Sequence, residues 1–390
     1  MDRYKQLYDE LMNGKGHVSH SQLQKYSICP KKWWYYMVAR LRTNRIEEVV
    51  GRRTLGKLIH MGLELSIRKK VCVSEYANNI KWCTDKLMSR NLDQMYADWL
   101  DNTIKEYTMT TPEGIMVKGA VLDEEMILLN ELIFQAKSIV PRVIRELNLD
   151  NAPWETVLDH DGEPIIEYEL YSTLPNGVKV LSYVDWLIRD LSTGKYIVVD
   201  FKTTSRKKAN YDMDIQVSAI YNMALQQNGI ISEHGEAMIV EIDAKELKRP
   251  NLNKDGTMSK AQIHTTWDIY KEDLIANDLN PDDYLDMRRK LMNVKFTSIH
   301  HIMRTAYEAN AIWQNRSIYT DRLLHDLQTA DPSKFIANLG GMHCAMCEYR
   351  DACNEDVAGY GFQDLVDSGI YKIAEFEDED EIVEVDDDKQ

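Results

Sequence analysis

Residues 178–221 constrain the fold of this chain more than any other stretch, because they place acidic side chains inside apolar runs. The runs 178–190 and 196–206 predict two β-strands joined by a turn. Asp185 lies in the first strand and Asp200 in the second. An ionised carboxylate among Val, Ile, Leu and Trp costs several kcal/mol unless something compensates its charge. A bound metal ion would provide that compensation.

Side-chain alternation along the second strand adds a positive charge at the same place. Because successive side chains point to opposite faces of a strand, Asp200 and Lys202 share one face. Two carboxylates on neighbouring strands with a lysine beside them are what metal-assisted phosphodiester hydrolysis requires. The carboxylates hold Mg²⁺ through oxygen, and the lysine positions the attacking water and offsets charge that develops on the phosphate.

The spacing of these residues resembles that of a known family. The pattern Asp185-x14-Asp200-x-Lys202, followed by Gln216 and Tyr221 on a predicted helix, is similar to the PD-(D/E)XK nucleases, in particular their RecB-like branch. The resemblance implies an α/β fold with a restriction-endonuclease-like core, in which helices flank a mixed central β-sheet of four or five strands. The sequence of residues 63–150 has helical periodicity and predicts a large helical insertion beside that core.

A histidine upstream of the strands completes the metal site that the resemblance implies. The stretch 51–57 imitates a phosphate-binding loop, but Leu58 stands where such a loop needs Ser or Thr, so we reject an ATPase. The same stretch contains Gly56-x3-His60, which resembles the family's upstream G-x3-H element. The resemblance implies the following ligands for Mg²⁺ or Mn²⁺: His60, Asp185, Asp200 and the main-chain carbonyl of Phe201.

Four residues around these ligands have expected roles of their own. The resemblance implies that Lys202 is the catalytic base or a charge stabiliser, and that Gln216 orients the lysine and the substrate phosphate. Tyr221 completes the family's Q-x3-Y pair one position late, so an ideal α-helix would rotate it by ~100° from the expected face, and a core position is the alternative. Glu167 is a secondary candidate, because relatives often carry a glutamate on the preceding strand. The alternative interpretation is that Glu167 lies on the solvent-facing side of an edge strand.

Three cysteines close together near the C-terminus predict a metal centre rather than disulfides, since the chain otherwise looks cytosolic. They are Cys344, Cys347 and Cys353. The remaining candidates for a fourth ligand are Cys29, Cys72, Cys83 and His343.

Resemblance selects Cys29, which Pro30 follows. Nucleases of the AddB kind and of CRISPR adaptation carry one cysteine before the core and three after it in this spacing. The resemblance therefore implies a 4Fe-4S cluster that joins the two ends of the fold. Structural Zn²⁺ is the alternative, because four thiolates also suit zinc. Cys72 and Cys83 are expected to be buried structural thiols.

The net charge of −16 does not exclude nucleic acid as a partner, because the charge is unevenly distributed. Residues 373–390 hold ten acids and one base, which predicts a disordered tail. Basic residues gather elsewhere, and the candidates for DNA phosphate contacts are Arg52, Arg53, Arg206 and Lys207. The aromatic run 33–36 is expected in the core, with stacking on single-stranded bases as the alternative.

Five segments organise the chain in this interpretation. They are N-terminal helices with the first cluster cysteine (1–62), a helical insertion (63–150), the nuclease core (151–245), C-terminal helices with the cysteine triplet (246–372) and the acidic tail (373–390). Neither a membrane span nor a secretory leader is evident, so we expect a cytoplasmic protein, cellular or phage-encoded.

The expected function is that of a Mg²⁺- or Mn²⁺-dependent deoxyribonuclease, an exonuclease on single-stranded DNA or DNA ends in recombination or repair. No helicase motif is evident, so unwinding would come from a helicase or recombination partner. The alternatives are an end-processing subunit that is active only in a complex and a non-catalytic iron–sulfur scaffold that binds DNA ends. A complete set of metal-site acids with Lys202 argues against the scaffold, because a pure binder has no need of them.

Overall fold

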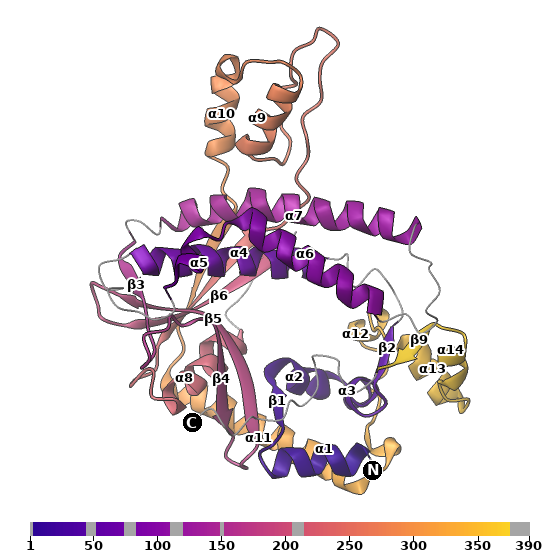
Figure 1. The fold of residues 1–390 in the computed structure, drawn as a ribbon. Helices are drawn as coiled ribbons and strands as arrows, with labels where there is room; N and C mark the ends of the chain where they lie inside the picture. Colours follow the sequence, from indigo (N-terminus) through magenta and orange to yellow (C-terminus); the bar gives the residue numbers. More distant parts are fainter. Residues whose placement is uncertain are drawn as a thin grey trace.

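The computed structural model describes residues 3–43, 52–73, 83–109, 120–148, 152–204 and 214–374. Within that part of the chain, a seven-stranded sheet of parallel and antiparallel strands forms the centre (Figure 1). Its main path runs through β1 (His17–Ser19), β5 (Lys179–Asp190), β6 (Tyr196–Thr204), β7 (Glu236–Asp243) and β8 (Thr297–Ile302). Two further strands pair with β5, namely β3 (Trp154–Thr156) and β4 (Ile166–Thr173). Helices flank this mixed sheet, which confirms the predicted fold class.

The sheet has more strands than the four or five expected. β1 and β3 are only three residues long, which is too short to show a periodic sequence signal. The predicted pair of β5 and β6 is antiparallel, while β6 and β7 are parallel and β7 and β8 antiparallel. The mixed pairing places β6, the strand with Asp200 and Lys202, inside the sheet.

The pairing of β5 opens halfway along one of its edges. One edge pairs with β4 over most of its length. The other edge pairs in parallel with β1 up to Leu181 and antiparallel with β6 from Trp186 onwards. Residues 182–185 therefore lie between β1 and β6 without a partner strand on that edge among the described residues. We call this opening the β5 fork.

One face of the sheet is covered by the helices that precede it in the sequence (Figure 1). They are α4 (Arg52–Val73), α5 (Asp85–Ser89), α6 (Leu92–Met109) and α7 (Ala120–Leu147). Leu58 of α4 and Val140 of α7 pack in one core with Phe201 of the sheet. α4 is continuous across residue 62, where the predicted insertion begins.

The other face is covered by η3 (Gln216–Tyr221) and α8 (Asn222–Gln227), which follow β6 directly. Val217 and Leu225 of these helices are buried against Val198 and Ile239 of the sheet. The long helix α11 (Ala306–Thr329) contacts both η3 and α8. It also contacts α2 (His20–Ile28), so it connects the sheet to the N-terminal helices.

The two ends of the chain form a common layer. α1 (Arg3–Met12), α2 and α3 (Pro30–Met37) share an apolar core with α11 and α13 (Arg350–Ala358). β2 (Leu41–Thr43) pairs antiparallel with β9 (Tyr371–Ile373), which α14 (Gln363–Asp367) precedes. All four aromatic residues 33–36 are buried, which confirms their assignment to the core. The predicted tail lies outside the described residues after Ala374.

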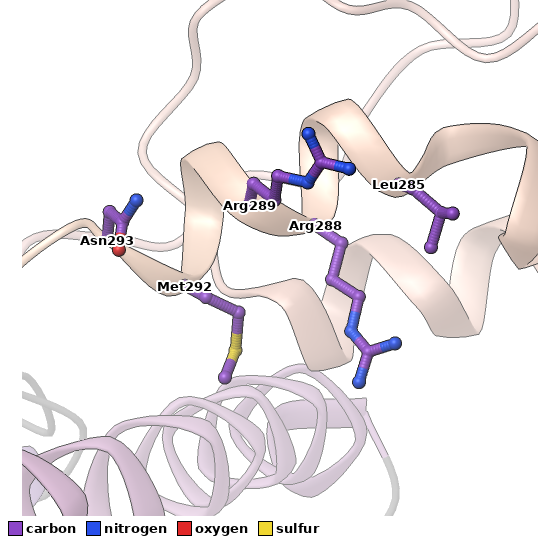
Figure 2. A pocket seen from close by; sticks show the side chains of 5 residues that line it. All are labelled: Leu285, Arg288, Arg289, Met292 and Asn293. Atoms are coloured by element: carbon purple, nitrogen blue, oxygen red, sulfur yellow. The ribbon is translucent and has the colours of Figure 1, made fainter.

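A small helical unit is inserted between β7 and β8 and projects beyond α7 (Figure 1). It contains α9 (Trp267–Ala276), η4 (Pro281–Tyr284) and α10 (Leu285–Met292), with a core of its own. A pocket of about 380 Å³ on α10 is lined by Leu285, Arg288, Arg289, Met292 and Asn293 (Figure 2). Its lining offers neither a carboxylate nor an imidazole, so it does not have the ligands of a metal site.

The expectation of free thiols at Cys72 and Cys83 is wrong, because the two residues form a disulfide. α4 ends at Val73 and the chain returns to start α5 at Asp85, which brings the two Cα atoms to 5.6 Å. Both side chains are half-buried. None of the helices in the described ranges has the length and apolar character needed to span a bilayer.

Candidate metal-dependent hydrolytic site

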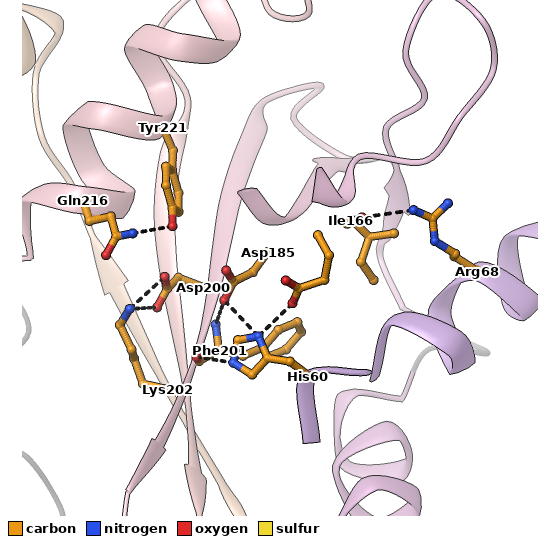
Figure 3. A network of polar contacts seen from close by, with 10 residues as sticks. His60, Arg68, Ile166, Asp185, Asp200, Phe201, Lys202, Gln216 and Tyr221 are labelled. Carbon is orange, nitrogen blue, oxygen red and sulfur yellow. Dashed lines mark hydrogen bonds and ion pairs between the residues drawn. The ribbon is translucent and has the colours of Figure 1, made fainter. Parts of the chain in front are cut away.

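Asp185, Asp200 and Lys202 meet at the β5 fork (Figure 3). The ladder of β5 and β6 ends at the pair Trp186 and Val199, so the main chain of the next residues is free to bond elsewhere. The N–H of Phe201 donates to Asp185 Oδ2 at 2.8 Å. Asp200 and Asp185 are 1% and 7% exposed, and the two buried acids therefore face each other where the strands separate.

Lys202 compensates part of this negative charge. Its Nζ lies 2.9 Å from Oδ1 and 2.8 Å from Oδ2 of Asp200. The predicted sharing of one strand face by the two residues is therefore confirmed. The Lys202 side chain is 29% exposed, so solvent reaches part of it.

α4 brings His60 to the same place. Its Nε2 is 3.0 Å from the carbonyl oxygen of Phe201, and its Nδ1 is 3.8 Å from Asp185 Oδ2. Gly56 allows this close approach of α4 to the sheet, since a Cβ there would lie 2.9 Å from Thr203 Oγ1. The Gly-x3-His spacing thus has a physical reason: the glycine permits contact with β6, and the histidine one turn later reaches the acids.

Glu167 is closer to the site than the sequence indicated. Its Oε1 lies 2.7 Å from His60 Nδ1, and the ligand atoms of Glu167, His60 and Asp185 all lie within 4.8 Å of one another. β4 pairs with β5 at Ile166 and Tyr168, with Glu167 between them at φ +45°, an uncommon conformation for a residue other than glycine. The interpretation of Glu167 as a wet edge residue is therefore wrong for its position, because its carboxylate contacts His60.

The donor set fits a divalent cation that prefers oxygen and accepts one nitrogen. Carboxylates of Asp185, Asp200 and Glu167, together with the Phe201 carbonyl, are hard oxygen ligands of the kind that Mg²⁺ binds. The imidazole of His60 favours Mn²⁺ over Mg²⁺ as the better partner for nitrogen. The set contains no thiol, which separates it chemically from the cysteines.

Electrostatics in the metal-free protein show the same demand for a cation. Burial, and then the charge of Asp200, raise the pKa of Asp185 to about 8. Burial lowers the pKa of His60, but its hydrogen bond to Glu167 and the charges of Asp185, Glu167 and Asp200 outweigh it and raise the pKa to about 9. Protons thus occupy the site at neutral pH where a metal ion would otherwise balance the acids.

We expect metal binding to release these protons, so that the apparent affinity for Mn²⁺ rises with pH. Both raised pKa values mean that protons compete with the metal below about pH 8, and competition ends above about pH 9. With two protons released, the affinity should rise by up to about a hundredfold per pH unit below about pH 8 and by up to about tenfold per unit from there to about pH 9. Calorimetric titration of Mn²⁺ without DNA measures this affinity. In His60→Gln the affinity should depend less steeply on pH. Equal affinity of the wild type across this pH range would contradict the expectation.

Gln216 and Tyr221 are brought together by a local departure from the α-helix. Residues 216–221 form a π-helix, in which hydrogen bonds join residues five apart. Gln216 Nε2 donates to Tyr221 Oη at 2.5 Å, although an ideal α-helix would have separated the two side chains. The extra residue in the spacing is thus absorbed by the π-turn. Tyr221 is also buried, so its ring belongs to the core while its hydroxyl faces the acids (Figure 3).

The four candidate cluster cysteines lie on the layer where the chain ends meet. Burial raises the pKa values of Cys347 and Cys353, and the charge of nearby Cys29 adds to both increases. Cys344 instead donates through Sγ to the carbonyl of Asn338 at 3.3 Å. Cys29, Cys347 and Cys353 are therefore neighbours across the two ends of the sequence, with Cys344 bonded to the adjoining loop.

The side chains of the basic residues predicted to contact DNA lie outside the described part of the structure. Arg52 and Arg53 are the first residues of α4, and the described part of the structure does not extend to their side chains. Arg206 and Lys207 lie outside the described residues. Their role stays a prediction.

A family model described as the PD-(D/E)XK nuclease superfamily matches residues 17–354. The matched region includes β1, the whole sheet with His60, Asp185, Asp200 and Lys202, and α11. No curated protein matches the chain significantly.

Proposed function

Because the chain belongs to the PD-(D/E)XK nuclease superfamily, we propose that it is a Mg²⁺- or Mn²⁺-dependent exonuclease of the RecB-like branch that acts on single-stranded DNA or DNA ends. The observation that carries hydrolysis is the convergence of two buried aspartates, His60 and Lys202 at the β5 fork. A buried carboxylate pair with a nearby ammonium group is costly for stability and useful for metal chemistry. The preference for ends rests on the resemblance to RecB-like nucleases.

His60, Asp185, Asp200 and the Phe201 carbonyl would hold the metal, with Glu167 as a further ligand or as the partner that orients His60. These residues would give a divalent cation the position from which it supplies Lewis-acid polarisation of the phosphodiester and activation of water. Lys202 serves as the base or offsets the charge on the phosphate, since Asp200 holds its ammonium group beside the acids. Gln216 restrains the Tyr221 hydroxyl. It would thereby help to position Lys202.

The four cysteines would hold a 4Fe-4S cluster that joins residue 29 to the C-terminal layer, with Zn²⁺ as the alternative metal. The proximity of Cys29 to Cys347 and Cys353 supports a shared centre. Recombination or repair in the cytoplasm of a cell or a phage host is the proposed setting. A helicase or recombination protein would supply unwound ends.

Digestion of DNA labelled at the 5′ or the 3′ end tests the activity. We expect short labelled products first from the end at which digestion begins, with Mg²⁺ or Mn²⁺ and not with EDTA. Circular single-stranded DNA distinguishes the modes of attack, because an exonuclease leaves it intact. Cutting of circles would replace exonuclease by endonuclease action. Binding of DNA ends without cutting under any metal would support the scaffold alternative.

A further inference from the structure

Two buried basic side chains near the β5 fork, those of His20 and Arg316, interact electrostatically with each other, and His20 also with Lys202. His20 is the first residue of α2, and Arg316 lies on α11; each is 8% exposed. His20 Nδ1 is buried with no hydrogen-bond partner. Arg316 makes no side-chain hydrogen bond or ion pair within the described ranges. Both are therefore polar groups with unused hydrogen-bonding capacity in the interior.

The β5 fork explains why these residues are close to the site. β1 ends at Ser19, which pairs with Leu181, so α2 starts where the fork opens. A capping box between Ser19 and Gln22 fixes that start and leaves His20 at the first helical position. On the other side of the fork, β6 presents Lys202. His20 and Lys202 thus flank the same opening from two strands that both pair with β5.

α11 adds Arg316 to this arrangement. Tyr26 Oη donates to Asp326 Oδ2 at 2.5 Å, which ties α2 to α11, and α11 also contacts η3. Burial, followed by the positive charges of Arg316 and Lys202, lowers the pKa of His20 to about 4. His20 is thus neutral at pH 7 in a region of positive potential.

A second buried arginine, Arg142, has protein partners for part of its guanidinium, although its Nε is buried without one. Arg142 is 2% exposed, and its Nη2 donates to the carbonyls of Met292 at 3.0 Å and Val294 at 2.5 Å. Glu146 lies 3.7 Å from the same nitrogen. Arg316 has no such partner among the described residues, and its guanidinium nitrogens are not among the fully buried unpaired atoms, so they stay in contact with solvent. An anion that arrives with the substrate would pair with this charge.

We propose that Arg316 and His20 bind a phosphate of the DNA strand that neighbours the scissile phosphate at Lys202. The planar guanidinium matches two phosphate oxygens, and the neutral imidazole donates a further N–H. This proposal deepens the proposed function and rests on it for the identity of the anion. It makes Arg316 and His20 substrate-binding residues that place the strand across the acids.

Binding measured without divalent metal tests the site apart from hydrolysis. In EDTA, Arg316→Gln should weaken the affinity for a short single-stranded oligonucleotide about 10- to 100-fold, as expected for a lost charged hydrogen bond. The salt dependence of binding should fall by about one phosphate contact. With metal, KM should rise by a similar factor while kcat changes less. His20→Ala should give a smaller loss of affinity.

Arg322→Gln is the matched control, since it removes an equal charge from an exposed position on α11, where the side chain interacts with Tyr26 of α2. It should leave the oligonucleotide affinity within about twofold of wild type, the size expected for an exposed charge. Thermal melting separates binding from folding: Arg316→Gln should melt no lower than wild type, whereas Arg142→Gln should melt lower. Inorganic phosphate should raise the melting temperature of wild type and not that of Arg316→Gln.

Unchanged oligonucleotide affinity in Arg316→Gln would overturn the phosphate site. If phosphate stabilises wild type but Arg316→Gln binds the oligonucleotide as tightly as wild type does, the site binds free phosphate and not a phosphate of DNA. That result would also overturn the proposal. Failure of the proposed hydrolysis is distinguishable: wild type would bind through Arg316 and cut nothing. Cleavage that Arg316→Gln leaves unaltered would retain the nuclease and remove only this site.

Discussion

Replacing Asp200 with Asn is expected to reduce DNA cleavage by about 10³-fold or more in Mg²⁺ and in Mn²⁺. Asp200 is 1% exposed, and its carboxylate lies between the ammonium of Lys202 and the acid Asp185. The amide keeps the size of the side chain and removes the charge that would hold the metal. Lys202→Ala should cause a loss of about 10²-fold or more, because it removes charge stabilisation at the phosphate. Single-turnover rates on labelled DNA measure both effects.

Lys195→Ala is the control for charge and for strand position. Lys195 immediately precedes β6, is 56% exposed in its side chain and pairs with Glu236 away from the acids. Its loss should change the rate less than about twofold, as is usual for an exposed ion pair. Each variant should still bind DNA, which separates chemistry from binding. Rates of Asp200→Asn within tenfold of wild type would remove this site as the catalytic centre.

If the proposed 4Fe-4S cluster is present, replacing Cys29 with Ser is expected to remove its iron and to lower the melting temperature of the protein by about 10 °C. Cys29 comes from the N-terminal part of the common layer, while Cys347 and Cys353 belong to its C-terminal part, so a shared cluster would close a loop of several hundred residues. Closing a loop longer than about 100 residues stabilises a fold by about 4–5 kcal/mol in the chain-entropy description. A change of that size shifts the melting of a large domain by about 10 °C.

Iron and zinc analysis after anaerobic purification, a visible spectrum and thermal melting check this expectation. Cys83→Ser is the matched control, because it breaks the disulfide with Cys72 and leaves the four other cysteines in place. It should keep the metal content. A colourless wild type with stoichiometric zinc would establish the alternative metal. Full stability and unchanged metal content in Cys29→Ser would remove the residue from the ligand set.

Local patterns in the sequence were sufficient for much of the catalytic strand pair. Alternation along 196–204 placed Asp200 and Lys202 on one face, and their contact at 2.8 Å follows from that periodicity. The capping residues Ser19 and Gln22 likewise act within one helical turn. Such features depend on residues a few positions apart, so the sequence contains their cause.

Features that depend on irregular backbone were not predictable in the same way. Glu167 contacts His60 and has a positive φ within β4, and the π-turn aligns Gln216 with Tyr221 across an odd spacing. Regular helical periodicity predicts the opposite orientation for Tyr221, and the positive φ of Glu167 has no signal in the sequence. The position of Glu167 on the strand next to Asp185 was a usable signal in the sequence. For the π-turn, the only signal was the extra residue between Gln216 and Tyr221.

The order of residues determined which side chains alternate, where helices start and which acids stand in apolar strands, since these follow from bonds and contacts between near neighbours. Only the tertiary structure decided that β1 and β6 share one edge of β5, which placed His20 near Lys202, and that α11 packs on α2, which placed Arg316 near His20. The physical reason is that pairing and helix packing between distant segments are chosen by the total burial of the chain. A local sequence pattern does not contain the information about total burial.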